Sequence, residues 1–144
     1  MFARQISVFI ENTPGKLAGI SRILSDHGIN LLSMSIADTS NFGILRFICA
    51  DSETALKVVE DAGYSACMNE VLAVPVADRP GGLAAILEIL SSRGISVEYM
   101  YSFNHAVDGN ALVVLRTDDY SLASCVLEEN GVHIFSHEEI CKLC

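Results

Sequence analysis

The sequence predicts an α+β fold of two tandem βαββαβ modules, and three observations support this. Shifting the chain by 66 positions places residues 8–29 on residues 74–95, and eleven of the twenty-two pairs are identical, which indicates a duplication. Each copy combines the period-two pattern of strands with the one-sided apolar spacing of a helix. A glycine after each predicted helix can end it in a left-handed conformation.

The first strand and helix of each copy have the clearest pattern. Apolar residues alternate along residues 6–10, and residues 72–76 form a more buried counterpart. Pro14 and Pro80 suit a first helical turn, and Thr13 can cap the first helix. Apolar positions then fall on one face of each helix, which predicts that the helices cover a sheet.

The rest of each copy reads as two strands, a helix and a strand. Strands are expected at 30–37 and 44–49, and again at 96–103 and 111–116, joined by turns at 39–41 and 108–110. The repeat offset changes to 68 after these strands, which indicates a two-residue insertion around 104–110 in the second copy.

The second helix of each copy has its own start and stop signals. It is expected to open at Asp51 or Ser52 in the first copy and at Asp119 or Ser121 in the second, and to close at a glycine. A last strand follows in each copy. The predicted domains are residues 1–69 and 70–144, both with the ferredoxin-like order.

Composition argues for a folded protein that associates. Hydrophobic residues make up 51% of the 144 and charged residues 19%, with a mean hydropathy of +0.39. Two small cores enclose little apolar surface, so we expect a homodimer. The net charge of −9 disfavours nucleic acid and anionic membranes as partners.

The cysteines and the first residues favour the cytoplasm. Five cysteines, most of them within apolar runs, suit reduced, buried thiols better than a disulfide framework. The first residues lack the apolar core of a signal peptide, and no apolar stretch reaches membrane-spanning length.

The most specific motifs are Asn-x-Pro-Gly-x-Leu at residues 12–17 and Asp-x-Pro-Gly-x-Leu at 78–83, each followed by Gly-Ile-Asn or Gly-Ile-Ser. This pattern resembles the ACT domain, a module that binds amino acids and regulates metabolic enzymes. The resemblance implies one eight-stranded antiparallel sheet with helices on one face, formed by two modules side by side, with ligand sites at the module interface. It also implies an enzyme of amino-acid metabolism as a partner.

A free amino acid suits these motifs chemically. Exposed N–H groups at a helix N-terminus favour its carboxylate, and Asn12 or Asp78 can accept hydrogen bonds from its ammonium. We expect Asn30 and Ser96 at the same sheet end as these residues. The predicted ligand-binding residues are Asn12, Thr13, Pro14, Gly15, Lys16, Leu17, Asn30, Asp78, Arg79, Pro80, Gly81, Gly82, Leu83, Ser96, Tyr99 and Tyr101.

Serine-sensing members of the family resemble this chain at Asn12 and Asn30. Those members carry a histidine two residues before the first asparagine, where this chain has Ile10 and, in the second copy, Val76. Because the second copy has Asp78 and Ser96 instead, its site is expected to be more acidic and to favour an ammonium or a cationic side chain.

Two further features of the sequence allow other interpretations. His137, Cys141 and Cys144 have the spacing of one helical face, but a metal site there lacks a fourth ligand, and a buried terminal helix begun by a Ser136–Glu139 capping box explains them better. No histidine belongs to a catalytic constellation, so we expect no enzyme, no metal and no cofactor. The alternative function is a ligand-free assembly module that docks a partner.

Overall fold

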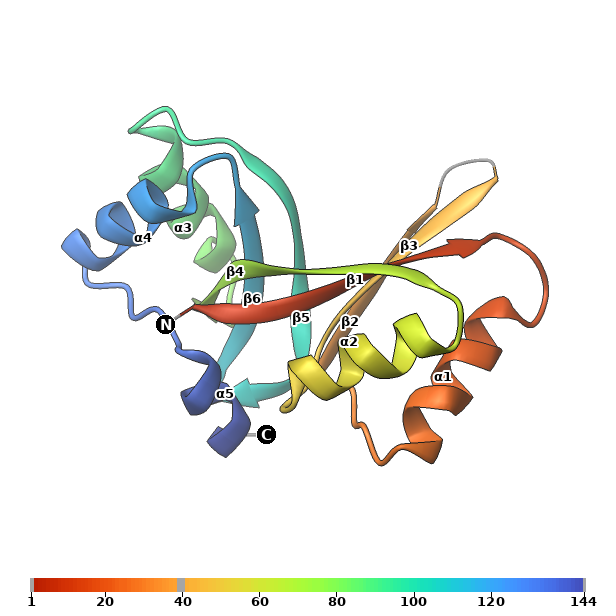
Figure 1. The fold of residues 1–144 in the computed structure, drawn as a ribbon. Helices are drawn as coiled ribbons and strands as arrows, with labels where there is room; N and C mark the ends of the chain where they lie inside the picture. Colours follow the sequence, from red (N-terminus) through yellow and green to blue (C-terminus); the bar gives the residue numbers. More distant parts are fainter. Residues whose placement is uncertain (1, 39–40, 144) are drawn as a thin grey trace. The chain divides into compact units, whose positions relative to one another are not determined.

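The computed structural model describes residues 2–38 and 41–143 and divides into two compact units. We call Arg4–Glu70 the first module, and Met1–Ala3 together with Val71–Cys144 the second module. Figure 1 shows the helices and strands along the chain. In chain order they are β1 (Ala3–Glu11), α1 (Lys16–Asp26), β2 (Ser33–Asp38), β3 (Phe42–Ile48), α2 (Ser52–Asp61), β4 (Ser65–Ala77), α3 (Gly82–Ser91), β5 (Val97–Val107), β6 (Asn110–Thr117), α4 (Tyr120–Glu129) and α5 (His137–Leu143).

The two modules repeat the same strand pairing. In the first module β3 pairs antiparallel with both β1 and β2, and in the second module β6 pairs antiparallel with both β4 and β5. Each central strand is therefore the second strand of the predicted hairpin. This arrangement confirms the α+β class and the tandem modules that the repeat predicts.

The predicted eight-stranded sheet is wrong, because the described residues form six strands and no open eight-stranded sheet. The last strand expected in the first copy and the strand expected at 72–76 are one continuous strand, β4, since no turn residue interrupts the chain between them. The strand expected after α4 is absent from residues 132–136. There α5 begins within a few residues of the Gly131 turn, and Phe135 N–H donates a single hydrogen bond to Ala73 O at 2.9 Å.

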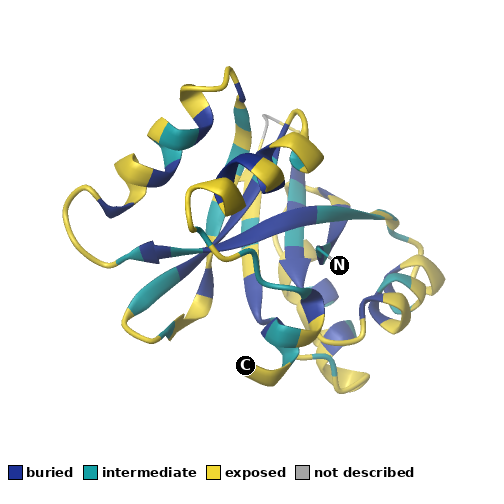
Figure 2. Ribbon diagram, turned by 90° about the vertical axis from the view of Figure 1, so that its left-hand side faces the viewer, coloured by how far each residue is buried: buried dark blue, intermediate teal, exposed yellow. Residues whose placement is uncertain are grey.

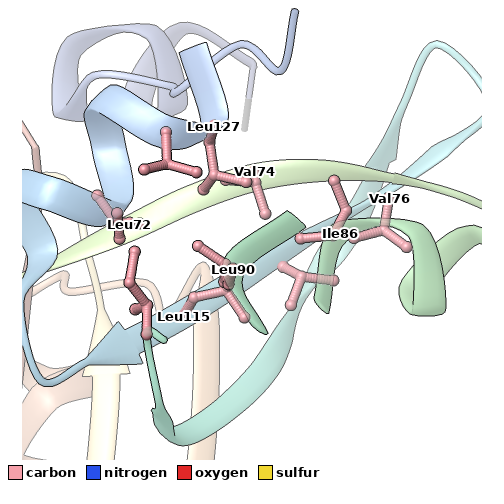
Figure 3. Packing of buried hydrophobic residues seen from close by; sticks show 11 residues of the cluster. Leu72, Val74, Val76, Ile86, Leu90, Leu115 and Leu127 are labelled. Carbon is pink, nitrogen blue, oxygen red and sulfur yellow. The ribbon is translucent and has the colours of Figure 1, made fainter. Parts of the chain in front are cut away.

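Each module packs its helices on one face of its own sheet. In the second module, inward-facing side chains of β4 and β6 meet those of α3 and α4, and Figure 3 shows Leu72, Val74 and Leu90 among them. Ile6, Val8 and Phe47 have the same role in the first module, beneath α1 and α2. Figure 2 shows the outer helix faces as exposed, as the apolar spacing predicts.

The predicted boundaries are confirmed for the starts of α2 and α4 and for the glycine stops, whereas Pro14 and Pro80 precede the helices that they were expected to begin. Asp51 accepts a hydrogen bond from Thr54 N at 3.1 Å, and Asp119 accepts one from Leu122 N at 3.0 Å, so these residues cap α2 and α4. The glycines that follow the four predicted helices all have positive φ, at residues 28, 63, 94 and 131. Thr13 does not cap α1, because the N-cap is Gly15 and no side chain caps it.

The hairpin of the second module contains the predicted insertion. Asp108 and Gly109 have positive φ and form a two-residue loop between β5 and β6, as a tight antiparallel hairpin requires. Ser102 pairs with Val113 and Ala106 with Ala111, so four steps along β5 match two along β6. The two extra residues therefore form a bulge in β5 just before the turn. In the first copy, Thr39 and Ser40 of the expected turn lie outside the described residues.

The expectation of buried thiols holds only in part. Cys49 is buried, whereas Cys67 and Cys125 are exposed. Cys67 alternates along β4 with Ala66 and Met68, which pack against the first core. Cys67 is therefore exposed because its side chain points to the other face of β4, although the residues around it in the sequence are apolar.

Candidate functional site

The two Pro-Gly motifs form nearly identical turns before α1 and α3. Gly15 and Gly81 have φ of 87° and 88° and serve as N-caps, and neither cap makes a side-chain hydrogen bond. A left-handed φ is cheap only for glycine. The two helices thus begin with backbone N–H groups that no capping side chain covers.

A hollow lies beside the start of α1. It has a volume of about 270 Å³ and is lined by Phe9, Ile10 and Glu11 of β1, by Lys16, and by residues 62–65 of the turn after α2. The end of β1, the start of α1 and this turn therefore meet at one end of the first module.

A second hollow occupies the equivalent place beside α3. Its lining residues come from the end of β4, the start of α3, the start of β6 and the turn after α4: Pro75, Ala77, Arg79, Pro80, Gly81, Gly82, Ala85, Ile86, Asn110, Gly131, Val132 and His133. Offsets of 66 and 68 relate the two linings, because Glu11 corresponds to Ala77 and Ser65 to His133. The duplication has therefore produced a hollow in each module.

The second hollow is the larger, at about 480 Å³. Ala77 and Gly82 stand where the first module has Glu11 and Lys16, so two long side chains are missing from its lining. A Cβ atom on Gly82 would overlap the carbonyl oxygen of Ala77. The close approach of α3 to the end of β4 therefore requires glycine here.

The predicted ligand-binding residues are divided among several places. Lys16 lines the first hollow, and residues 79–82 line the second. Leu17 lines an apolar groove between α1 and β2, while Asn30 lines a separate hollow beside the start of α2. The other predicted residues line none of these three hollows or this groove: Asn12, Thr13, Pro14, Gly15, Asp78, Leu83, Ser96, Tyr99 and Tyr101.

The expectation that Asn30 shares a sheet end with Asn12 is wrong. Asn12 N–H donates to Asn41 O beside the start of β3, whereas Leu32 N–H donates to Ile48 O at its end. A strand rises by about 3.4 Å per residue, so the two ends of β3 are about 20 Å apart. One module alone cannot bring both asparagines to a single small ligand.

The same geometry separates Asp78 from Ser96. β4 ends opposite Asn110 at the start of β6, whereas Ser96 N–H donates to Asp118 just beyond the end of β6, at 3.2 Å. The strand order explains both cases. β4 and β5 are both antiparallel to β6 and therefore parallel to each other, so α3 carries the chain from the end of β4 back to the opposite end of the sheet. β1, α1 and β2 have the same relation in the first module.

Tyr99 and Tyr101 stack on each other instead of lining one of these hollows. Their ring centroids are 6.4 Å apart and the ring planes differ by 16°. Both belong to β5 and point to the same side of the strand. Their role in the structure is therefore packing along the strand.

The residues that sequence reasoning missed come from the turn after α4 and from the start of β6. His133 and Asn110 line the second hollow, and neither belongs to the Pro-Gly motif. The changed repeat offset would have pointed to His133, since it aligns with Ser65 of the first hollow. The lining of this hollow is not the acidic site expected from Asp78, because it contains Arg79 and His133 but not Asp78.

His133 connects the second hollow to α5. Its Nε2 lies 2.9 Å from Oε1 of Glu139, and Oε2 of Glu139 accepts a hydrogen bond from Ser136 N at 2.7 Å. Ser136 Oγ in turn accepts from Glu139 N at 3.1 Å, which completes the predicted capping box. The Ser136 hydrogen bond, assisted by His133, lowers the pKa of Glu139.

We therefore expect α5 to lose stability in acid. A carboxyl group whose pKa is lowered in the folded state stabilises the fold at pH values above the ordinary glutamate pKa. This contribution is lost as the pH falls through the pKa of the folded state. Glu139→Gln should flatten the acid limb of a plot of unfolding midpoint against pH, whereas Glu138→Gln should leave it unchanged. Equal slopes for Glu139→Gln and the unmodified protein would contradict this role.

Across residues 2–38 and 41–143, no three His, Cys, Asp or Glu side chains are grouped so that they could hold a metal ion. Of the three residues considered as metal ligands, His137, Cys141 and Cys144, the last lies outside the described residues. His137 is buried, and Cys141 is partly buried on α5.

Comparison with known proteins decides the family. The family model described as "ACT domain pair" matches residues 1–144. The chain belongs to the ACT domain pair family. As an ACT domain pair it resembles a protein of known structure from Bacteroides thetaiotaomicron, with 34% identity, a TM-score of 0.90, and coverage of 99% of this chain and 97% of that one.

More distant structures share the fold. The regulatory subunit of aspartate kinase from Thermus thermophilus, in ligand-free form, is 18% identical with a TM-score of 0.63, covering 89% of this chain and 91% of that one. Its counterpart from Thermus flavus is 19% identical with a TM-score of 0.64, covering 89% and 90%. No curated protein gives a significant match. No helix in the described part of the chain is long and apolar enough to cross a membrane.

Proposed function

We propose that this ACT domain pair is a non-catalytic cytoplasmic sensor that binds a free amino acid and regulates a partner protein. The observation that carries the proposal is the pair of equivalent hollows, each beside a helix start whose cap makes no side-chain hydrogen bond. Helix N-termini attract carboxylates. The similarity to regulatory subunits of aspartate kinase supports an enzyme of amino-acid metabolism as the partner.

A homodimer is part of this proposal. Leu17, Met34 and Ile36 line an apolar groove of about 320 Å³ and are each 43–47% exposed. Covering these side chains would stabilise such an association.

The test is a screen of thermal stability against the twenty amino acids, one at a time. A ligand at a hundred times its dissociation constant stabilises the folded state by about 2.7 kcal/mol. We expect a selective rise in the unfolding temperature that is reduced when a lining residue is replaced, in Lys16→Ala for the first hollow or in Arg79→Ala for the second. Asp26→Ala, at the other end of α1, is the matched control and should keep the full shift.

If a folded sample responds to none of the twenty, the sensor proposal is wrong. The assembly-module alternative then becomes the better account, and it predicts that Leu17→Ser changes partner binding while Asn12→Ala does not. Sedimentation of the free protein, with and without the ligand, measures the dimer separately.

A further inference from the structure

The two hollows differ in charge as well as in size, and this bears on which ligands they accept. The first hollow has one acidic and one basic residue in its lining, Glu11 and Lys16. The second has Arg79 and His133 and no carboxylate side chain among its lining residues. We propose that the second hollow is an anion-binding site that selects an amino acid with a side-chain carboxylate. This inference rests on the proposed sensor function.

Arg79 supplies the charge that is left uncompensated. Within the described residues, ion pairs are found for Arg4, Arg93 and Arg116 but none for Arg79. A guanidinium can form a bidentate pair with a carboxylate.

His133 adds a second polar contact on another side of the hollow. Its Nε2 lies 2.9 Å from Oε1 of Glu139, so this ring is already engaged by a carboxylate, and Arg79 provides the positive charge of the lining. Asn110, at the start of β6, contributes an uncharged amide that can donate to a carboxylate. Contacts therefore come from the start of α3, from β6 and from the turn after α4.

The available volume accommodates a ligand with two carboxylates. Small-molecule sites generally have volumes of about 300–1,000 Å³, and the second hollow, at about 480 Å³, is in this range. The first hollow, at about 270 Å³, is below it and keeps the long side chains of Glu11 and Lys16. The two modules therefore have unequal sites, and the acidic ligand belongs to the second.

The experiment compares aspartate and glutamate with their uncharged isosteres asparagine and glutamine by titration calorimetry on the full chain. We expect one acidic amino acid to bind at least about tenfold more tightly than its amide, the magnitude of one charge-assisted hydrogen bond. Its affinity should weaken with added salt. Arg79→Gln should remove the preference, and Arg79→Lys, which keeps the charge, should retain part of it.

Arg93→Gln is the matched control, because Arg93 is exposed beyond the far end of α3 and pairs with Glu129; its affinities should not change. Tighter binding of the neutral amino acids overturns the anion site but leaves the sensor proposal standing. Acidic binding that is unchanged in Arg79→Gln also overturns it. Tight binding of succinate that requires Arg79 would support the anion site while contradicting amino-acid sensing, because succinate lacks an ammonium.

Discussion

Replacing Leu90 by alanine is expected to lower the free energy of unfolding by about 2–5 kcal/mol, the range for removing a buried leucine side chain. Leu90 lies on the inner face of α3 with no exposed surface, among β4, β6 and α4 side chains. The cost combines lost apolar burial with the cavity that the neighbours cannot fill. Urea denaturation measures it through the midpoint at constant slope.

Leu83→Ala is the control for this substitution, because the same side chain is removed from the same helix at a position that is 37% exposed. Its cost should be much smaller. Equal losses for the two variants would contradict the assignment of the inner face of α3.

Gly82→Ala is expected to have the second large effect, on both stability and the second hollow. The added Cβ would overlap the carbonyl oxygen of Ala77, a backbone atom that cannot rotate away. Overpacking of this kind costs typically about 1–3 kcal/mol. The start of α3 must move off the end of β4, which displaces the residues that line the hollow, so ligand binding should fall together with stability.

Gly19→Ala separates this steric effect from the general behaviour of glycine in helices. A Cβ on Gly19 would meet only Tyr64 Oη at 3.8 Å, an ordinary contact. Alanine is favoured over glycine inside a helix by up to about 1 kcal/mol. Gly19→Ala should therefore raise the unfolding midpoint, and a loss in both variants would contradict the proposed reason for Gly82.

Local signals in the sequence predicted much of the fold. The aspartate caps, the glycine stops and the Asp108-Gly109 turn depend on neighbouring residues, and the structure confirms them. The insertion was also correctly located, because it changes the repeat offset, although it appears as a bulge in β5.

The errors concern what distant segments do together. The lack of a turn residue beside Glu70 was a local sign that the two strands could join into β4, but nothing local shows that residues 132–136 form no strand before α5. Strand order places Asn30 at the far end of β3, and a linear motif does not contain that order. The second hollow was only half predicted, since His133 reaches it from a turn some fifty residues beyond the Pro-Gly motif.

Amide chemical-shift mapping with the amino acid that stabilises the protein tests the central claim most directly. We expect saturable changes concentrated at Gly81, Gly82 and residues 131–133, with smaller changes at the equivalent positions of the first module, which share the geometry but not the volume. Saturable changes confined to residues away from both hollows, or none with any amino acid, would contradict the account.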